Sequence, residues 1–154
     1  MKITHSKDAA WGDAMQKGNF WQRRKELGST GKLACGLWEL PPGKKSFPFH
    51  LHHVTEEALF VVSGTAKVRT AEGLTAIGPG DWVGFPPGEA HQLINDGTEP
   101  LIYMAMGVSI GVDVVEYPDS GKVASSIGTG DSRKRYLFNK ANEAGYFDGE
   151  PDAK

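Results

Sequence analysis

The sequence is poor in cysteine and has no long apolar run. Cys35 is the only cysteine among the 154 residues, so no disulfide can form within one chain. It lies in the apolar segment LACGLWEL, where a small buried thiol is expected rather than a nucleophile. No apolar stretch has the length needed to span a bilayer, and the opening segment MKITHSKDAAWGDAM lacks the apolar centre of a secretory signal. We therefore expect no membrane partner and a cytoplasmic location.

An excess of charge of one sign is also missing. The chain has 17 Lys and Arg residues against 19 Asp and Glu residues, which gives a formal net charge of −2. Arg23, Arg24 and Lys25 form only a short basic cluster. Because nucleic-acid binding needs a broad positive field, the sequence predicts no nucleic-acid partner.

Turn-forming residues, in contrast, are abundant. The chain contains 20 Gly and 9 Pro, while its 39% hydrophobic and 23% charged residues are ordinary for a soluble globular protein. Its length suits one domain that buries a substantial core. From Leu33 onward, short segments rich in Val, Ile, Phe and Trp are separated by turns such as PPGK, GPGD and NDGTEP. This pattern predicts an all-β domain, with strands near residues 33–40, 47–53, 58–63, 65–71, 74–77, 81–85, 90–95, 100–107 and 112–117.

The two ends of the chain differ from this middle part. Residues 1–32 are polar and dotted with glycine, and the charged run QRRKELG within them is compatible with one or two helical turns. After Tyr117 the sequence is polar again, and its last aromatic residues indicate a tail that packs on the β domain or on a partner subunit. We therefore divide the chain into an N-terminal extension (1–32), a β domain (33–118) and a C-terminal tail (119–154).

Four potential metal ligands are grouped in two segments of the β domain. His50 and His52 precede Glu57 in PGKKSFPFHLHHVTEEALFVVSG, and His91 lies in GPGDWVGFPPGEAHQLIND. Because side chains alternate faces along a strand, His50 and His52 point to the same side and can share one ion. Taken alone, each histidine is more often a surface or hydrogen-bonded residue, but the joint spacing favours a metal site. Three imidazoles and a carboxylate suit Fe, Mn, Ni, Zn, Co or Cu, and they leave coordination positions open for substrate or water.

These residues resemble the two sequence motifs of the cupin superfamily. The first motif has Gly, His-x-His, Glu and Gly in order, and the second has Gly, Pro-x-Gly, His and Asn. The first is matched by Gly43, His50, His52, Glu57 and Gly64, with six residues between Gly43 and His50 where five are usual, and the second by Gly80, Pro86, Gly88, His91 and Asn95. The resemblance covers roughly residues 33–118, so the two ends of the chain inherit nothing from it.

The resemblance implies a fold and a ligand set. The chain is similar to small single-domain bacterial cupins, which implies a single jelly-roll β-barrel whose alternate residues fill the interior. One divalent transition metal ion would be bound by His50, His52, Glu57 and His91, and Glu57 could also swing away as a catalytic general base. Glu56 competes for the carboxylate place, but the interval from Glu57 to the last glycine of the first motif favours Glu57.

Other residues near the motifs have more ordinary interpretations. His53 should face away from the site because it adjoins His52, and Asn95 is expected to form hydrogen bonds at a strand end. Alternation allows only about half of the candidate pocket-wall residues to face inward. These candidates are Phe47, Phe49, Phe60, Trp82, Phe85, Leu93, Tyr103 and Met104, with Trp38, Lys67 and Arg69 either lining the pocket or on its outer wall.

Function is less constrained than fold, because the superfamily includes dioxygenases, isomerases, decarboxylases, storage proteins and ligand-sensing domains. We expect a metal-dependent, dioxygenase- or isomerase-like enzyme acting on a small oxygen-rich organic molecule. A sugar phosphate isomerase would need basic groups for phosphate, for which the β domain supplies Lys44, Lys45, Lys67 and Arg69. The alternative is a non-catalytic module that binds a carbohydrate-like or aromatic ligand. Since an exposed sheet edge is costly to leave unpaired, we also expect a homodimer, with residues 1–32 as a contributor.

Overall fold

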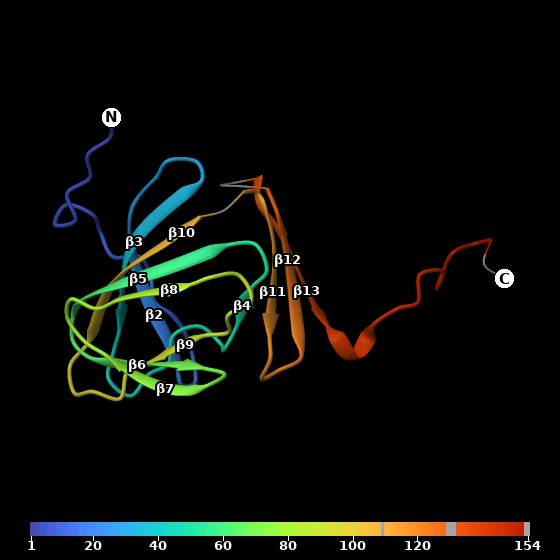
Figure 1. Ribbon diagram of the computed structural model, residues 1–154. Coiled ribbons are helices and arrows are strands. Elements are labelled where there is room, and N and C mark those ends of the chain that lie inside the picture. The colour runs from blue at the N-terminus through green and yellow to red at the C-terminus, as the bar shows by residue number, and fades with distance from the viewer. Residues whose placement is uncertain (109, 129–131, 153–154) are drawn as a thin grey trace.

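Strands make up most of the fold, as the all-β prediction requires. The computed structural model describes residues 1–108, 110–128 and 132–152 (Figure 1). No helix in this described part of the chain combines the length and the apolar character that crossing a bilayer demands. The elements are β1 (Met15–Lys17), β2 (Phe20–Ser29), β3 (Leu33–Leu40), β4 (Leu51–His52), β5 (Glu56–Ser63), β6 (Ala66–Thr70), β7 (Gly73–Ile77), β8 (Trp82–Phe85), β9 (Gln92–Ile94), β10 (Leu101–Val108), β11 (Val112–Tyr117), β12 (Lys122–Ile127), β13 (Lys134–Asn139) and the short 3-10 helix η2 (Lys140–Asn142).

Two layers of strands form the barrel. One layer is a six-stranded sheet in the order β1-β2-β3-β10-β5-β8, and the other consists of a four-stranded sheet, β13-β12-β11-β4, and a three-stranded sheet, β7-β6-β9. A backbone bridge between His50 and His91 joins the β4 side of one small sheet to the β9 side of the other. The two small sheets therefore continue one another as a single layer, and the expected jelly-roll double layer is confirmed.

Alternation along the strands produces the core between the layers. On β5 and β10, Leu59, Val61, Leu101 and Tyr103 face inward and are at most 3% exposed, whereas Phe60 on the other face is 36% exposed. Side chains from β6, β7 and β9 complete the same apolar cluster. Burial of an aliphatic side chain of this size stabilises the fold by about 1.5–3 kcal/mol. Among the expected pocket-wall residues, Phe49, Phe85, Leu93 and Tyr103 are buried, while Phe60 and Trp82 are exposed.

The N-terminal extension contains a strand where helical turns were expected. The run QRRKELG lies within β2, which pairs with β3, so the helical interpretation is wrong. Both Nε and Nη2 of Arg23 donate to Glu39 Oε2 on β3, at 2.9 and 2.7 Å, and Gln22 is only 4% exposed. Contacts across the sheet thus outweigh the local helical tendency of this charged run.

The C-terminal tail adds two strands that the sequence pattern did not reveal. β12 and β13 extend the sheet beyond β11, and Figure 1 shows these three strands side by side at one end of the barrel, with the last residues leading away. Ala124 and Ser126 of β12 are buried, but all six residues of β13 are exposed. Tyr146 and Phe147 are 92% and 67% exposed, so the expected packing of this tail on a partner subunit stays a prediction. Residues 129–131 and 153–154 of the tail lie outside the described residues.

Candidate metal centre

Two histidines from distant segments are held next to each other by the backbone. His50 N donates to His91 O at 3.2 Å, and His91 N donates to His50 O at 2.8 Å. In such a hydrogen-bonded antiparallel pair, both side chains leave the sheet on the same face. Their ring centroids are 4.7 Å apart, and the two residues are 8% and 7% exposed. The strand expected at 47–53 is reduced to β4 and this bridge, since Pro48 has no N–H for a ladder.

Backbone carbonyls orient both of these imidazoles. His50 Nδ1 lies 2.8 Å from Pro48 O, and His91 Nδ1 lies 3.1 Å from Glu89 O. A carbonyl can only accept, so each Nδ1 carries a proton, and in the neutral form of the ring Nε2 keeps its lone pair. Phe85 stacks on His91 with ring centroids 3.8 Å apart and planes within 8°, which holds that ring in place. Both histidines therefore present a nitrogen in the form that a metal ion binds.

Glu57 reaches the same point from the opposite layer. It lies near the start of β5, between Phe85 of β8 and Gly107 of β10 in the register of the sheet. Its Oε2 is 3.3 Å from His91 Nε2. One ligand atom from each of His50, Glu57 and His91 lies within 4.8 Å of the others. Three of the four expected ligands are thus brought together by two sheets.

His52 lies close to this group but is not one of the residues whose ligand atoms all lie within 4.8 Å of one another. Its Nε2 lies 3.4 Å from Glu57 Oε2, and its ring centroid is 5.1 Å from that of His50. The group of mutually close ligand atoms, searched over the described residues, contains His50, Glu57 and His91. Glu57 Oε2 thus lies 3.4 Å from His52 Nε2 and 3.3 Å from His91 Nε2.

Protonation in this cluster follows from burial and neighbouring charge. Burial, followed by repulsion from His91, lowers the pKa of His50 to about 4, so this imidazole is neutral at pH 7. Burial alone would raise the pKa of Glu57, but hydrogen bonds with His52 and His91 outweigh it and lower that pKa. Burial alone would lower the pKa of His52, but its contacts with Glu57 and then Asp113 raise it. The cluster therefore offers an ionised carboxylate and a neutral imidazole.

The donor set fits a divalent transition metal ion. Two buried imidazoles and one ionised carboxylate converge within 4.8 Å, and a third imidazole adjoins the carboxylate. Nitrogen and oxygen donors of this kind suit several first-row metals, so the donors do not select one identity. His53 and Glu56 stay outside the cluster: His53 Nε2 lies 2.9 Å from Glu116 Oε1, and Glu56 is exposed.

An aromatic wall continues from the candidate metal centre along the barrel. Phe47 meets His50 edge to face with centroids 6.0 Å apart, and Trp38 meets Phe47 in the same way at 5.3 Å. Tyr103 stacks on Trp38 at 6.5 Å. Burial, followed by the charge of Glu57, raises the pKa of Tyr103, so its hydroxyl stays protonated. A substrate at the centre would therefore lie beside aromatic surface as well as beside charged groups.

Two residues at the site were missed by sequence reasoning. Asp113 contacts His52 Nδ1 at 2.5 Å, and Tyr117 stacks on His50 with ring centroids 6.2 Å apart. Both residues come from β11, on which Asp113 and Tyr117 share a face with buried Val115. The signal in the sequence was an acidic residue, Asp113, on the same strand face as Val115 and Tyr117, a place where an unpaired charge would be costly.

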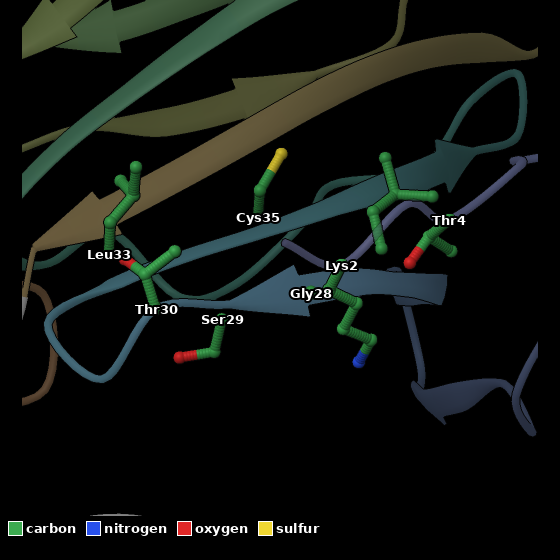
Figure 2. Close-up of a pocket in the computed structure, with 8 residues that line it drawn as sticks. Lys2, Thr4, Gly28, Ser29, Thr30, Leu33 and Cys35 are labelled. Carbon is green, nitrogen blue, oxygen red and sulfur yellow. The ribbon is translucent and has the colours of Figure 1, made fainter.

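A shallow surface pocket lies on the outer face of the six-stranded sheet, away from the candidate metal centre. The pocket has a volume of about 250 Å³. Figure 2 shows its lining residues on β2, β3 and the N-terminal segment, with Lys2, Thr4 and Cys35 among them. On β3, Ala34 pairs with Gly107 and so shares the inward face with Glu57, whereas the next residue, Cys35, faces outward. Burial raises the pKa of the Cys35 thiol, which does not favour a reactive thiolate.

Known proteins share this architecture. The sequence model of the Cupin domain family matches residues 36–107. A solved structure from Acidithiobacillus ferrooxidans, named as a candidate sugar phosphate isomerase, is 34% identical, with a TM-score of 0.68, and the match covers 79% of this chain and 80% of that one. No curated protein has a significant match to this chain.

Two more distant structures support the fold alone, because their identities are low. One, from Silicibacter pomeroyi, is named a sugar phosphate isomerase of the cupin superfamily; it is 19% identical, with a TM-score of 0.79 and coverage of 92% of this chain and 95% of that one. The other, from Thermotoga maritima, is named as a candidate oxalate decarboxylase. It is 20% identical, with a TM-score of 0.63, and the match covers 71% of this chain and 100% of that one. The family match, the 34% identical relative and the jelly-roll fold together place this chain in the cupin family.

Proposed function

We propose that this cupin is a metal-dependent enzyme acting on a small oxygen-rich organic molecule. The observation that supports the proposal is the convergence of two buried imidazoles and one carboxylate, from His50, His91 and Glu57, within 4.8 Å. A divalent ion bound there would supply a Lewis acid that holds substrate oxygens and makes neighbouring protons more acidic. In this proposal His52 is the fourth ligand.

Glu57 has two candidate roles in the proposed reaction. Contacts with His52 and His91 lower the pKa of this carboxylate and keep it ionised, so it must leave these two histidines before it can take up a proton. Its side chain is 34% exposed, compared with 14% for His52 and 9% for His91, and it is therefore the most accessible of these groups. A residue in that position can remain a metal ligand or move to take a proton from a bound substrate.

Proton transfer between carbon atoms is the reaction class that we place first. The 34% identical relative is named as a candidate sugar phosphate isomerase, which supports a polyhydroxy substrate here as well. Two of the four groups expected to bind phosphate already contact carboxylates: Lys67 Nζ lies 2.6 Å from Asp96 Oδ2, and Arg69 donates to both oxygens of Asp119 at 2.6 and 2.8 Å. A phosphate would have to compete with these carboxylates, so we propose a sugar or sugar acid as the first substrate class to test.

Metal analysis is the first experiment. Protein purified without added metal is analysed for bound elements, together with His91→Ala and with His53→Ala as the matched control. We expect His91→Ala to lose the metal and His53→Ala to keep it, because His53 faces Glu116 outside the cluster. Equal metal content in all three proteins, or none in the wild type, would contradict the proposed centre.

Substrate turnover is the second experiment. Metal-loaded protein is incubated in D₂O with a panel of sugars and sugar acids, and the incorporation of deuterium at carbon is followed by NMR. We expect incorporation with the wild type and none with Glu57→Gln. Oxygen uptake instead of deuterium incorporation would favour a dioxygenase, and saturable binding without either reaction would favour a non-catalytic binding module.

We also propose that the chain forms a homodimer. β1 and β13 are outermost strands of their sheets, and among the described residues no further strand pairs with their outer edges. An open edge favours pairing with another chain. Exposed Tyr136 and Phe138 on β13 and residues 1–32 are the segments that such a contact would use first. Light scattering coupled to size-exclusion chromatography should give twice the mass of the chain, and the mass of one chain would refute the dimer.

A further inference from the structure

A buried carboxylate outside the candidate ligand set contacts one member of that set. Asp113, on β11, is 3% exposed, and its Oδ2 lies 2.5 Å from His52 Nδ1. Because an ionised carboxylate only accepts hydrogen bonds, Nδ1 carries the proton in this contact. The antiparallel register places Val115 opposite His52, which brings Asp113 of the same strand face to the end of β4.

The second oxygen of Asp113 binds the turn after β4. Oδ1 accepts hydrogen bonds from the backbone N–H of Val54 at 3.2 Å and of Thr55 at 3.4 Å. This turn leads directly into β5, which carries Glu57. A single carboxylate therefore holds both the ring of His52 and the backbone that separates it from the next candidate ligand.

His52 depends on this long-range contact more than the other two histidines do on theirs. The Nδ1 atoms of His50 and His91 meet carbonyls two residues earlier in the chain, so local geometry orients those rings. The acceptor for His52 comes from 61 residues further along the chain. β4 itself has only two residues, and the ring of His52 otherwise lies beside His50 and Glu57.

We infer that Asp113 is a positioning residue that fixes the tautomer and the direction of His52, so that Nε2 is available as the fourth metal ligand. The inference rests on the proposed function, because it takes metal binding at His50, Glu57 and His91 as given. In the neutral ring the single proton is held on Nδ1, which leaves Nε2, 3.4 Å from Glu57 Oε2, able to coordinate an ion. A carboxylate behind a ligating imidazole also makes that imidazole a stronger donor.

Asp113→Asn is the sharpest variant, because it keeps the shape of the side chain. The amide oxygen can still accept from Val54 and Thr55, and the amide NH₂ then faces His52 Nδ1. An NH₂ group donates, so the imidazole proton must move to Nε2, where it blocks coordination. Measured by competition with a chelator, affinity for Zn²⁺ should fall about ten- to hundred-fold. The visible spectrum of bound Co²⁺ should change as one nitrogen ligand is lost.

Glu116→Gln on the same strand is the matched control. Glu116 Oε1 lies 2.9 Å from His53 Nε2, so this variant also removes a carboxylate from an imidazole, but on the exposed face. Its affinity for Zn²⁺ should equal that of the wild type. If both variants lose affinity equally, the loss comes from the change in net charge, and the inference is overturned.

A double-mutant cycle tests whether Asp113 acts through His52. In a His52→Ala background, Asp113→Asn should cause no further loss of Zn²⁺ affinity, because the ring that it positions is absent. The same loss in both backgrounds would mean that Asp113 acts elsewhere in the site. That result would overturn the inference even though Asp113→Asn weakens binding.

A measurement on the metal-free wild type tests this inference separately from the proposed function. It also needs no variant, so it cannot fail because a variant does not fold. Nitrogen–proton correlation spectra of the metal-free wild type at alkaline pH report which nitrogen of each imidazole is protonated. We expect His52 to carry its proton on Nδ1; a proton on Nε2 would overturn the inference. A wild type that binds no Zn²⁺ while keeping the Nδ1 proton would refute the proposed metal site but not the contact with Asp113.

Discussion

The asparagine that ends the second cupin motif should be a large contributor to stability. Asn95 is 0% exposed. Its Nδ2 donates to Leu40 O at 2.8 Å and to Glu99 O at 2.9 Å, and its Oδ1 accepts from Gly97 N at 3.0 Å. One side chain therefore joins the end of β3 to the loop that leads into β10. We predict that Asn95→Ala strongly lowers the free energy of unfolding.

The expected magnitude follows from these three hydrogen bonds. Each bond contributes about 1 kcal/mol net, and a buried partner left without a bond adds to the loss. With the space left by the missing amide, the total decrease should be about 3–5 kcal/mol. This is a large share of the about 5–15 kcal/mol that stabilises a typical domain. The midpoint of thermal unfolding should fall by about 6–20 °C.

Urea unfolding of the metal-free protein, followed by tryptophan fluorescence, measures this loss. Asn95→Asp keeps the shape and the acceptor for Gly97, but it places an oxygen against the carbonyls of Leu40 and Glu99. At neutral pH it should therefore destabilise at least as much as Asn95→Ala. Asn142→Ala, at an exposed position, should change stability by less than about 0.5 kcal/mol. Values within about 1 kcal/mol of the wild type for both Asn95 variants would refute the reasoning.

Three further predictions concern the backbone and the protonation of the site. Gly64→Ala should lower the midpoint of thermal unfolding far more than Gly18→Ala. Both glycines have a positive φ, but a Cβ at Gly64 would lie 2.3 Å from Pro100 O, whereas a Cβ at Gly18 would meet nothing within 4 Å. Equal midpoints for the two variants would contradict this prediction. In the metal-free protein, His50 has a pKa of about 4 against 6.5 when unfolded, so the unfolded state takes up this proton first as the pH falls. The stability that this histidine contributes should therefore decrease by up to about 3 kcal/mol between pH 6.5 and about 4. Urea titrations at several pH values should show that the free energy of unfolding changes with pH differently in the wild type and in His50→Gln over this range. The pKa of His52 is raised above 6.5, so this residue is more than half protonated at pH 6.5, and metal binding should release a proton. Calorimetry in buffers of different ionisation enthalpy measures the release, and its absence would exclude His52 as a ligand.

Local patterns were sufficient to predict most strands of the barrel. The segments expected at 33–40 and 112–117 coincide with β3 and β11, because alternating apolar residues between turn residues leave few other arrangements. The same alternation correctly predicted that His53 faces the opposite side from His52. These features depend on a residue and its near neighbours, and a sequence carries that information directly.

Strands with polar or mixed sequences could not be predicted in this way. QRRKELG forms β2 because β3 offers it a paired edge and Glu39 offers Arg23 a carboxylate. β12 likewise forms by pairing with β11, and β13 by pairing with β12, rather than from apolar patterns of their own. In each case the stabilising partner is a neighbouring strand, and its edge exists only after the chain has folded.

The candidate metal centre combines both kinds of information. The motif spacing predicted His50, His52, Glu57 and His91 as candidate ligands, and the structure brings His50, Glu57 and His91 within 4.8 Å of one another. Their approach to one another, and the contact of Asp113 with His52, depend on which strands pair and in what register. Register is set by hydrogen bonds and packing summed over whole sheets, so only the folded chain specifies which buried carboxylate stands behind which imidazole.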